Sequence, residues 1–311
     1  MNQKKIVVIM GGTSTEASVS RQTGTAILNA LKSKGYNAVG MELEPQNFAE
    51  QIKASHCDIV FNALHGKFGE DGVLQGTLDM LGIPYTGSGV LAAAVTMDKA
   101  ASKRVFLGAG ISTPRSKTYH RFAMEQALQE IQQEFSLPVV VKAASQGSSI
   151  GVVIVEEPAA LKEALAEAFQ YDDEVLVEEF IQGKELTVAV WGDAEKQEAF
   201  PIIEITTTSG RYDYESKYTK GASTHIIPAR VSAELTKKIQ QLAMDTFAAC
   251  DCRGVARVDL MLSEDGVPYV IEVNSVPGMT ELSLVPDAGR AMGIEFPELC
   301  ERILLMAGCE K

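Results

Sequence analysis

The chain has 311 residues, which is long enough for two or three domains with substantial cores. Hydrophobic residues make up 46% of it, so an intrinsically disordered chain is excluded. The formal net charge is −13, with acidic and basic residues mixed along the sequence, and this argues against a nucleic-acid partner.

Cysteines and apolar runs predict the compartment. The five cysteines are odd in number and form no CxxC pair, so we expect reduced thiols. The apolar run Ile6–Met10 is too short for a signal peptide, and no apolar stretch reaches membrane-spanning length. We therefore expect a cytoplasmic enzyme with no membrane partner.

Strands and helices alternate in the first part of the chain. Apolar runs predict strands at Lys5–Met10, Asn37–Glu42 and Asp58–Asn62, and a helix at 18–33 that ends near Gly35. This alternation predicts a parallel sheet with crossover helices.

Two loops follow strands of this predicted sheet, at the edge where open α/β sheets bind ligands. Glu16 lies in the first loop, which lacks the G-x-G-x-x-G fingerprint, and is a candidate ligand for a substrate cation. A solvent-exposed or helix N-terminal charge is the alternative for Glu16. His65 begins a glycine-rich loop, and can contact a ligand or serve as a structural hydrogen-bonding group.

The middle of the chain begins at the linker Gly87-Ser88-Gly89. Helices are predicted at 73–81, 91–107, 122–134 and 159–168, and strands at 137–142, 152–155 and 174–179. Lys142 ends a strand and precedes the Gly/Ser loop at 143–151. This loop can offer N–H groups and hydroxyls to phosphate, or it can be an ordinary hairpin loop.

The last third is expected to begin with strands at 184–191 and 201–206. Residues 210–225 are polar, rich in tyrosine and lysine, and without clear periodicity, which is typical of a functional lid. An amphipathic helix is predicted at 233–250.

Two alternating runs near the C-terminus predict a hairpin with a two-residue turn at Asp265-Gly266. In that register Glu264 faces Val267, and all polar residues share one face. Val258, Leu260, Ile271 and Val273 fall on the opposite face.

The same register pairs Asp259 with Glu272 and Arg257 with Asn274. Two carboxylates directly opposite repel each other unless a cation lies between them. Mg²⁺ takes one or two carboxylates together with water and phosphate oxygens, so Asp259, Glu272 and Asn274 predict a Mg²⁺ site. A solvated, charge-balanced face is the alternative.

The order of these motifs resembles the ATP-grasp superfamily, and most closely the D-alanine–D-alanine ligase family. The matching stretches are Gly11–Glu16, His65–Gly72, Met97–Lys99, Lys142 with Gly147–Gly151, Tyr212–Tyr218, Arg257–Asp259, Glu272–Thr280 and Ser283–Pro286. They cover nearly the whole chain. Gln146 departs from the family pattern, which often has glutamate there.

The resemblance implies a three-domain α/β fold in which an N-terminal parallel domain (1–88) precedes two α+β domains (89–181 and 182–311) that sandwich ATP. It also implies ligation of two D-alanines through an acyl phosphate. The implied partners are D-alanine and ATP, with two Mg²⁺ ions (or Mn²⁺), in a homodimer.

The resemblance also implies residue roles. ATP would be held by Lys99, Lys142, Ser148, Ser149, Glu178, Glu179, Phe180, Ile181 and Glu185. The two D-alanines would be held by Glu16, His65, Lys217, Ser283 and Leu284. Arg257 and the Gly278 N–H would stabilise the oxyanion, and Ser148 and Tyr218 would close over the site with Glu16.

Two alternative functions remain open. A D-alanine–D-lactate ligase of the same fold is one, although such relatives lack the Lys217-Tyr218 pair. A nucleotide-binding regulator without turnover is the other, although it should lack a metal ligand or Arg257, and this sequence has them all.

Overall fold

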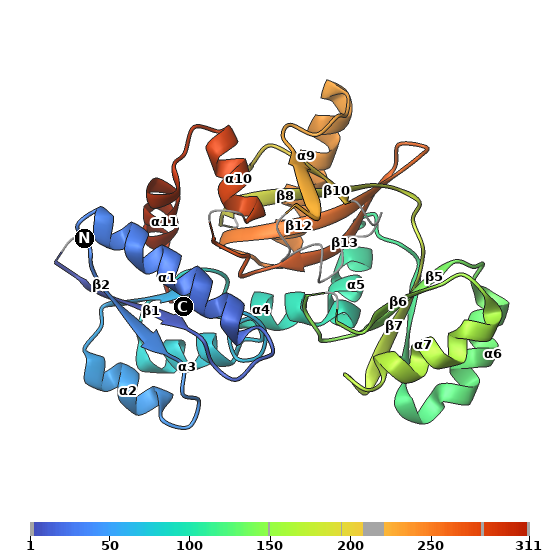
Figure 1. Ribbon diagram of the computed structural model, residues 1–311, viewed down its shortest axis with the longest axis horizontal. Helices are drawn as coiled ribbons and strands as arrows, with labels where there is room; N and C mark the ends of the chain where they lie inside the picture. The colour runs from blue at the N-terminus through green and yellow to red at the C-terminus, as the bar shows by residue number, and fades with distance from the viewer. Residues whose placement is uncertain (1–2, 149, 194, 208–220, 281–282, 310–311) are drawn as a thin grey trace.

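The computed structural model describes residues 3–148, 150–193, 195–207, 221–280 and 283–309, and these form three sheets with flanking helices (Figure 1). Among the described residues, no helix is both long and apolar enough to cross a bilayer.

The first sheet is parallel, as the sequence predicts. Its strands are β1 (Lys5–Met10), β2 (Asn37–Glu42) and β3 (Ile59–Asn62), with β1 in the centre. Alternate residues of β1 enter two cores, one with α1 (Ala17–Ser33) and the other with α2 (Phe48–Ser55) and α3 (Val73–Leu81). Burial on both faces explains why β1 is a continuous apolar run. Helix α2 was not predicted from the sequence.

The second sheet is antiparallel and has four strands in the order β4-β7-β5-β6. These are β4 (Ser116–His120), β5 (Val139–Ala143), β6 (Val152–Val155) and β7 (Glu174–Glu179). Helices α6 (Met124–Glu134) and α7 (Leu161–Ala168), with the short turns η1 (Arg121–Ala123) and η2 (Pro158–Ala160), lie on its outer side (Figure 1).

The third sheet has six strands. They are β8 (Gly183–Gly192), β9 (Gln197–Ala199), β10 (Ile203–Thr207), β11 (Ser223–Ile226), β12 (Gly254–Ser263) and β13 (Pro268–Asn274). One face packs on α9 (Ala233–Ala249). Residues of the other join α1, α10 (Leu284–Ala291) and α11 (Phe296–Leu305) in the core shared with β1. Strand β11 corrects the prediction of irregular structure through residue 225.

The helix predicted at 91–107 is two helices, α4 (Val90–Met97) and α5 (Lys99–Gly108). Asp98 separates them in an extended conformation, and its side chain accepts a hydrogen bond from the Ala101 N–H at 2.8 Å. Aspartate at this position competes with the helix by capping a new one. The break lets α5 begin with Lys99 in a new direction.

The predicted two-residue hairpin turn is wrong. Ser263 pairs with Val267 across a three-residue loop in which Gly266 has φ of +81°, so Glu264 does not face Val267. The register then shifts by one between Asp259 and Leu260, so that Leu260 pairs with Val270. This β-bulge restores the predicted pairs Asp259–Glu272 and Arg257–Asn274.

The bulge also changes which side chains enter the core. Val258, Leu260 and Val273 are buried there as predicted, but Val270 takes the place expected for Ile271. The predicted domain boundary at residue 88 falls between the first sheet and α4, and the one at residue 181 falls between β7 and β8. These boundaries stay a prediction.

Candidate active site

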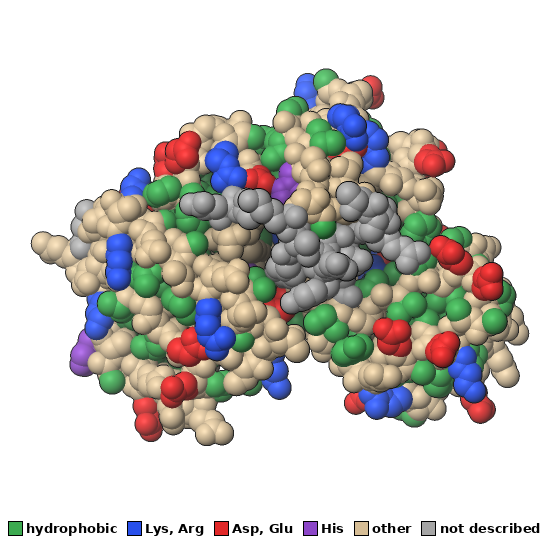
Figure 2. Space-filling model, in the orientation of Figure 1, with side chains coloured by type: hydrophobic (Ala, Val, Ile, Leu, Met, Phe, Trp, Pro, Cys, Tyr) green, Lys and Arg blue, Asp and Glu red, His purple; other side chains and the backbone are tan. Residues whose placement is uncertain are grey.

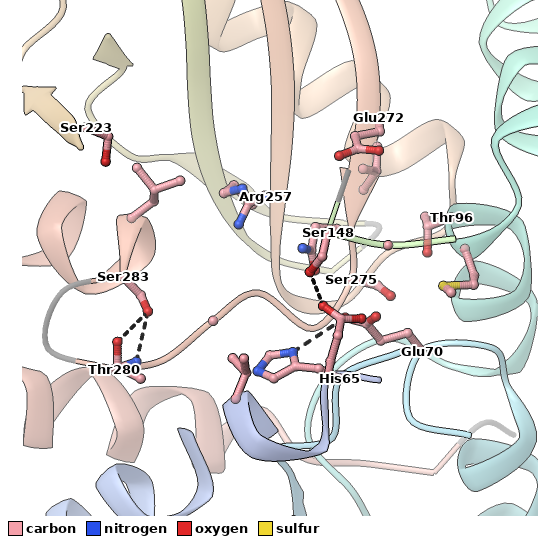
Figure 3. Close-up of a pocket in the computed structure, with 18 of the residues that line it drawn as sticks. His65, Glu70, Thr96, Ser148, Ser223, Arg257, Glu272, Ser275, Thr280 and Ser283 are labelled. Atoms are coloured by element: carbon pink, nitrogen blue, oxygen red, sulfur yellow. Dashed lines mark hydrogen bonds and ion pairs between the residues drawn. The ribbon is translucent and has the colours of Figure 1, made fainter. Parts of the chain in front are cut away.

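A cavity of about 620 Å³ is lined by loops that follow strands of the first and second sheets and by residues on strands of the third. It contains Glu16 and His65 from the first unit, Lys99 and Ser148 from the middle, and Arg257, Glu272 and Asn274 from the hairpin. Figure 3 shows His65, Ser148, Arg257 and Glu272 facing the same space. Ten of the predicted site residues are thus brought together; Gly278, Ser283 and Leu284 complete the set.

The loops after β1 and β3 place Glu16 and His65 at one end of the cavity. Both are largely buried. His65 Nε2 lies 3.1 Å from Thr23 Oγ1, and its Nδ1 lies 3.7 Å from Glu70 Oε1. Glu70 also accepts the Gly66 N–H at 2.8 Å, so this carboxylate fixes the turn that carries His65. Two carboxylates here make the end of the cavity suitable for a cation such as an ammonium group.

The Gly/Ser loop reaches across the cavity to this acidic end. The Ser148 hydroxyl donates a short hydrogen bond to Glu16 Oε1, and Ser148 has φ of +51°, an unusual value for a residue other than glycine. A Cβ at Gly147 would lie 3.0 Å from Glu16 Oε2. Asp172 anchors the base of the loop by accepting the Ser145 N–H at 2.8 Å. The loop therefore brings its backbone so close to Glu16 that a side chain at 147 would displace the Glu16 carboxylate slightly.

Lys99 begins helix α5 and points to two other elements of the cavity. Its Nζ donates to the Gln146 carbonyl at 2.5 Å and lies 3.5 Å from Glu272 Oε2. It joins the Gly/Ser loop to strand β13. A phosphate bound by this loop would be within reach of its charge.

The hairpin carries the predicted metal ligands. Asp259 and Glu272 are directly paired on β12 and β13, and Asn274 Oδ1 is buried without a hydrogen-bond partner among the described residues. An unpaired buried amide oxygen beside two carboxylates fits a hard cation. In the described part of the chain, no three His, Cys, Asp or Glu side chains are arranged so that they could hold a metal ion by themselves. A site with two carboxylates suits Mg²⁺, which keeps water and phosphate as its other ligands.

Asp259 is held in place by two neighbours. Arg257 binds it through two hydrogen bonds, from Nε to Oδ1 at 2.8 Å and from Nη2 to Oδ2 at 2.7 Å. Thr187 on β8 donates to Oδ1 at 2.6 Å. This fork-to-carboxylate contact orients the guanidinium towards the cavity that it lines.

The far end of the cavity is the N-terminus of α10, with Ser283 as its N-cap residue. Ser283 Oγ accepts the Thr280 N–H at 3.0 Å, and a Cβ at Gly278 would lie 3.1 Å from this oxygen. Leu284 begins the helix. Free N–H groups at a helix N-terminus favour an anion, so this end suits a carboxylate.

A second cluster lies outside the lining of this cavity. Glu178 on β7 is 2% exposed and contacts two ammonium groups, Lys142 through a short ion pair and Lys103 at 2.7 Å. Burial alone would raise the pKa of Glu178, but the two lysines hold it below its usual range. The predicted hinge residues Glu179, Phe180, Ile181 and Glu185 are half-buried and do not line the cavity.

Sequence reasoning missed four residues of these networks, namely Glu70, Lys103, Asp172 and Thr187. Two left a signal in the sequence. Lys103 follows Lys99 at the i+4 spacing of one helix face, and Thr187 is a polar residue within an apolar strand. The predicted residues Ser149, Lys217 and Tyr218 lie outside the described residues, as does most of the predicted lid.

This chain is similar to known proteins in sequence. The family model described as "D-ala D-ala ligase C-terminus" matches residues 108–305, and the one described as "D-ala D-ala ligase N-terminus" matches residues 40–88. A D-alanine–D-alanine ligase of Pelotomaculum thermopropionicum is 46% identical, with 97% of this chain and 96% of the relative covered. A D-alanine–D-alanine ligase of Moorella thermoacetica is 47% identical, with 97% of this chain and 99% of the relative covered.

Solved structures agree with these sequence matches. A D-alanine–D-alanine ligase from Bacillus anthracis has a TM-score of 0.86 at 38% identity, covering 97% of each chain. The VanG D-Ala:D-Ser ligase from Enterococcus faecalis has a TM-score of 0.84 at 32% identity, covering 97% of this chain and 99% of that one. The predicted three-domain ATP-grasp fold is confirmed.

Proposed function

The chain belongs to the D-alanine–D-alanine ligase family, and we propose that it uses ATP to join two D-alanines for peptidoglycan precursor synthesis. The carboxylate of the first D-alanine takes the γ-phosphoryl group of ATP and releases ADP. The amine of the second attacks the resulting acyl phosphate, and the tetrahedral intermediate expels phosphate. One observation carries this proposal. A single cavity joins an acidic end, a Gly/Ser loop with a lysine, and an arginine beside two paired carboxylates.

The first substrate fits the acidic end of the cavity. Glu16 accepts the ammonium of the first D-alanine, and His65 lies beside it. The link between Ser148 and Glu16 fixes the distance between this ammonium and the Gly/Ser loop. Lys99 and Lys142, with Ser148 and Ser149, hold the phosphates. Phosphoryl transfer depends chiefly on such positioning and charge neutralisation.

The second substrate fits the opposite end. Ser283 and Leu284 at the α10 N-terminus receive its carboxylate, which directs its amine back towards the centre of the cavity. Arg257 and the Gly278 N–H then stabilise the oxyanion of the tetrahedral intermediate. Lys217 and Tyr218, outside the described residues, would cover the site.

Asp259, Glu272 and Asn274 would hold two Mg²⁺ ions, with Mn²⁺ as a substitute. The ions would neutralise charge on the transferred phosphoryl group. On the adenosine side, Glu178, Glu179, Phe180 and Ile181 would hold adenine, and Glu185 would hold ribose. Glu178 and Glu179 lie on β7 of the second sheet and Glu185 lies on β8 of the third, so both sheets would contribute to this adenosine site.

The decisive experiment measures ADP formation and dipeptide with ATP, Mg²⁺ and D-alanine. We expect both products in equal amounts, and a mixture of D-alanine and D-lactate should still yield mainly the dipeptide. A depsipeptide as main product would favour the D-lactate ligase. ATP binding without any ADP would favour the regulator.

We also propose a cytoplasmic homodimer. The only support for this assembly is the resemblance to the family. Sedimentation equilibrium at micromolar concentration should give twice the chain mass of 33.5 kDa. A mass of one chain across that range would contradict it.

A further inference from the structure

Lys103 is a buried cation with no role in the function proposed so far. It lies on α5, is 3% exposed, and its Nζ has three acceptors: Thr113 Oγ1 at 2.6 Å, the Pro114 carbonyl at 3.2 Å and Glu178 Oε2 at 2.7 Å. An ammonium group has three N–H donors, so this one is saturated. Burial lowers the pKa of Lys103, and the neighbouring Glu178 carboxylate opposes this shift.

Lys142 contacts the same carboxylate but is bonded differently. Its Nζ pairs with Glu178 Oε1, and the described residues offer it no other acceptor. Lys142 is therefore held by one contact, where Lys103 is held by three. Two ammonium groups and one carboxylate leave the cluster with one net positive charge, a surplus that suits a bound anion.

Glu178 creates a conflict if Lys142 holds a phosphate, as in the function proposed above. A buried carboxylate that loses its counter-ion is strongly destabilised, because no solvent replaces the lost partner. Lys142 could then leave Glu178 only at high cost. The second ammonium removes this cost, because Lys103 stays in place on its three acceptors while Lys142 moves.

We propose that Lys103 is a positioning residue for ATP: it neutralises Glu178, so that Lys142 is free to turn from Glu178 to a phosphate of the nucleotide. Its position is fixed from both sides. Thr113 accepts from Lys103 and donates to the Val270 carbonyl at 2.7 Å, beside the β-bulge that sets the Asp259–Glu272 pair. Lys99, four residues earlier on α5, lies 3.5 Å from Glu272 of that pair. One helix thus sets both phosphate-binding lysines.

The test measures nucleotide binding, with the KM for D-alanine as a check on the rest of the site. Lys103→Met should raise the Kd for Mg·ATP at least about tenfold in calorimetry, because Lys142 is retained by Glu178. The Kd for adenosine, measured by competition, should change less than about twofold, and so should the KM for D-alanine. Lys103→Arg should recover part of the ATP affinity. Equal losses for ATP and adenosine, or unchanged ATP affinity in a folded Lys103→Met, would overturn the proposal.

A second comparison remains decisive if Lys103→Met fails to fold. Glu178→Gln removes the charge that retains Lys142, so adding Lys103→Met to it should leave the Kd for ATP within about twofold of Glu178→Gln alone. A further tenfold loss would mean that Lys103 acts directly, against the proposal. The inference rests on the proposed function, but the two can fail separately. A wild-type protein that binds no ATP contradicts the function, whereas only the variants test Lys103.

Discussion

At the scale of single residues, the site depends on charges that face one another across strands. Asp259 and Glu272 face each other across β12 and β13, where Arg257 and Lys99 balance part of their charge, and Asn274 has a buried oxygen without a described partner. A bound cation would balance the carboxylates further and give this oxygen a partner. This pairing is the reason why these three residues were identifiable from sequence and are the most informative to mutate.

Glu272→Gln should reduce kcat at least about a hundredfold at saturating Mg²⁺ while the protein stays folded. Losing one ligand charge removes several kcal/mol of transition-state stabilisation. Glu264→Gln is the matched control, because Glu264 is an exposed carboxylate on the same hairpin. Near-normal kcat in Glu272→Gln would contradict the assignment of this residue to the metal site.

Arg257→Lys should also lose about a hundredfold in kcat, the scale of one oxyanion donor. The planar fork makes two hydrogen bonds to Asp259 at once, and an ammonium cannot reproduce this geometry. Steady-state kinetics with Arg104→Lys, an exposed site, as control would measure the effect. Activity within a few-fold of wild type would make Arg257 a scaffold residue.

Glu204 should make stability depend on acid. Hydrogen bonds from Arg230 lower the pKa of this buried carboxyl from 4.5 to about 2. Because the folded-state pKa is the lower one, this stabilisation is complete above pH 4.5 and is lost as the pH falls towards 2. Urea unfolding at several pH values should show a wild-type advantage over Glu204→Gln that shrinks across this window. A stability difference that does not change with pH would contradict the lowered pKa of Glu204.

At the scale of elements, local backbone devices decide where the site residues fall. The Asp98 break aims α5, and the bulge in β13 restores the register after a longer turn. Gly254 is a third such device. It begins β12 with φ of +74°, and a Cβ there would lie 3.0 Å from the Cα of Gly87 in the predicted linker.

Gly254→Ala should lower the free energy of unfolding by more than about 1 kcal/mol, because backbone strain and a backbone clash add. Gly266→Ala is the matched control, since Gly266 has φ of +81° but no atom within 4 Å of a Cβ. Chemical denaturation of both variants would separate the cost of the positive φ from the cost of the clash with Gly87. Equal losses would show that the approach of Gly87 carries no energy.

At the scale of the whole molecule, the cavity depends on all three sheets. Glu16 comes from the loop after β1, Ser148 from the loop after β5, and Arg257 from β12. On the described face, acidic and basic side chains are interspersed without a continuous basic surface (Figure 2).

A ligand that fills the cavity should stabilise the three units together. ATP, Mg²⁺ and a phosphinate mimic of the tetrahedral intermediate should raise the Tm by several degrees, since a ligand at a hundred times its Kd adds about 2.7 kcal/mol. Calorimetry with an L-alanine-based mimic as control would measure this. An unchanged Tm at saturation would mean that the cavity is not the ligand site.

The sequence by itself determined the order of most strands and helices and the paired carboxylates of the hairpin, because periodicity and charged side chains are local properties. The all-apolar run of β1 and the paired carboxylates of the hairpin are examples. The ATP-grasp fold and the other predicted cavity residues came from the resemblance of its motifs to a known family.

Only the tertiary structure decided where the buried charges find their partners. Lys103, Glu178 and Lys142 come from three elements far apart in the chain, and no local pattern reports that they meet. The contact between Thr187 and Asp259 also joins two strands that are distant in sequence. The local sequence of the hairpin is compatible with either register, and the burial of Val270 in the core selects the one with the bulge. The register of the hairpin and the partners of the buried charges are decided by packing, because Val270 is buried and Glu178 is neutralised only in the assembled core.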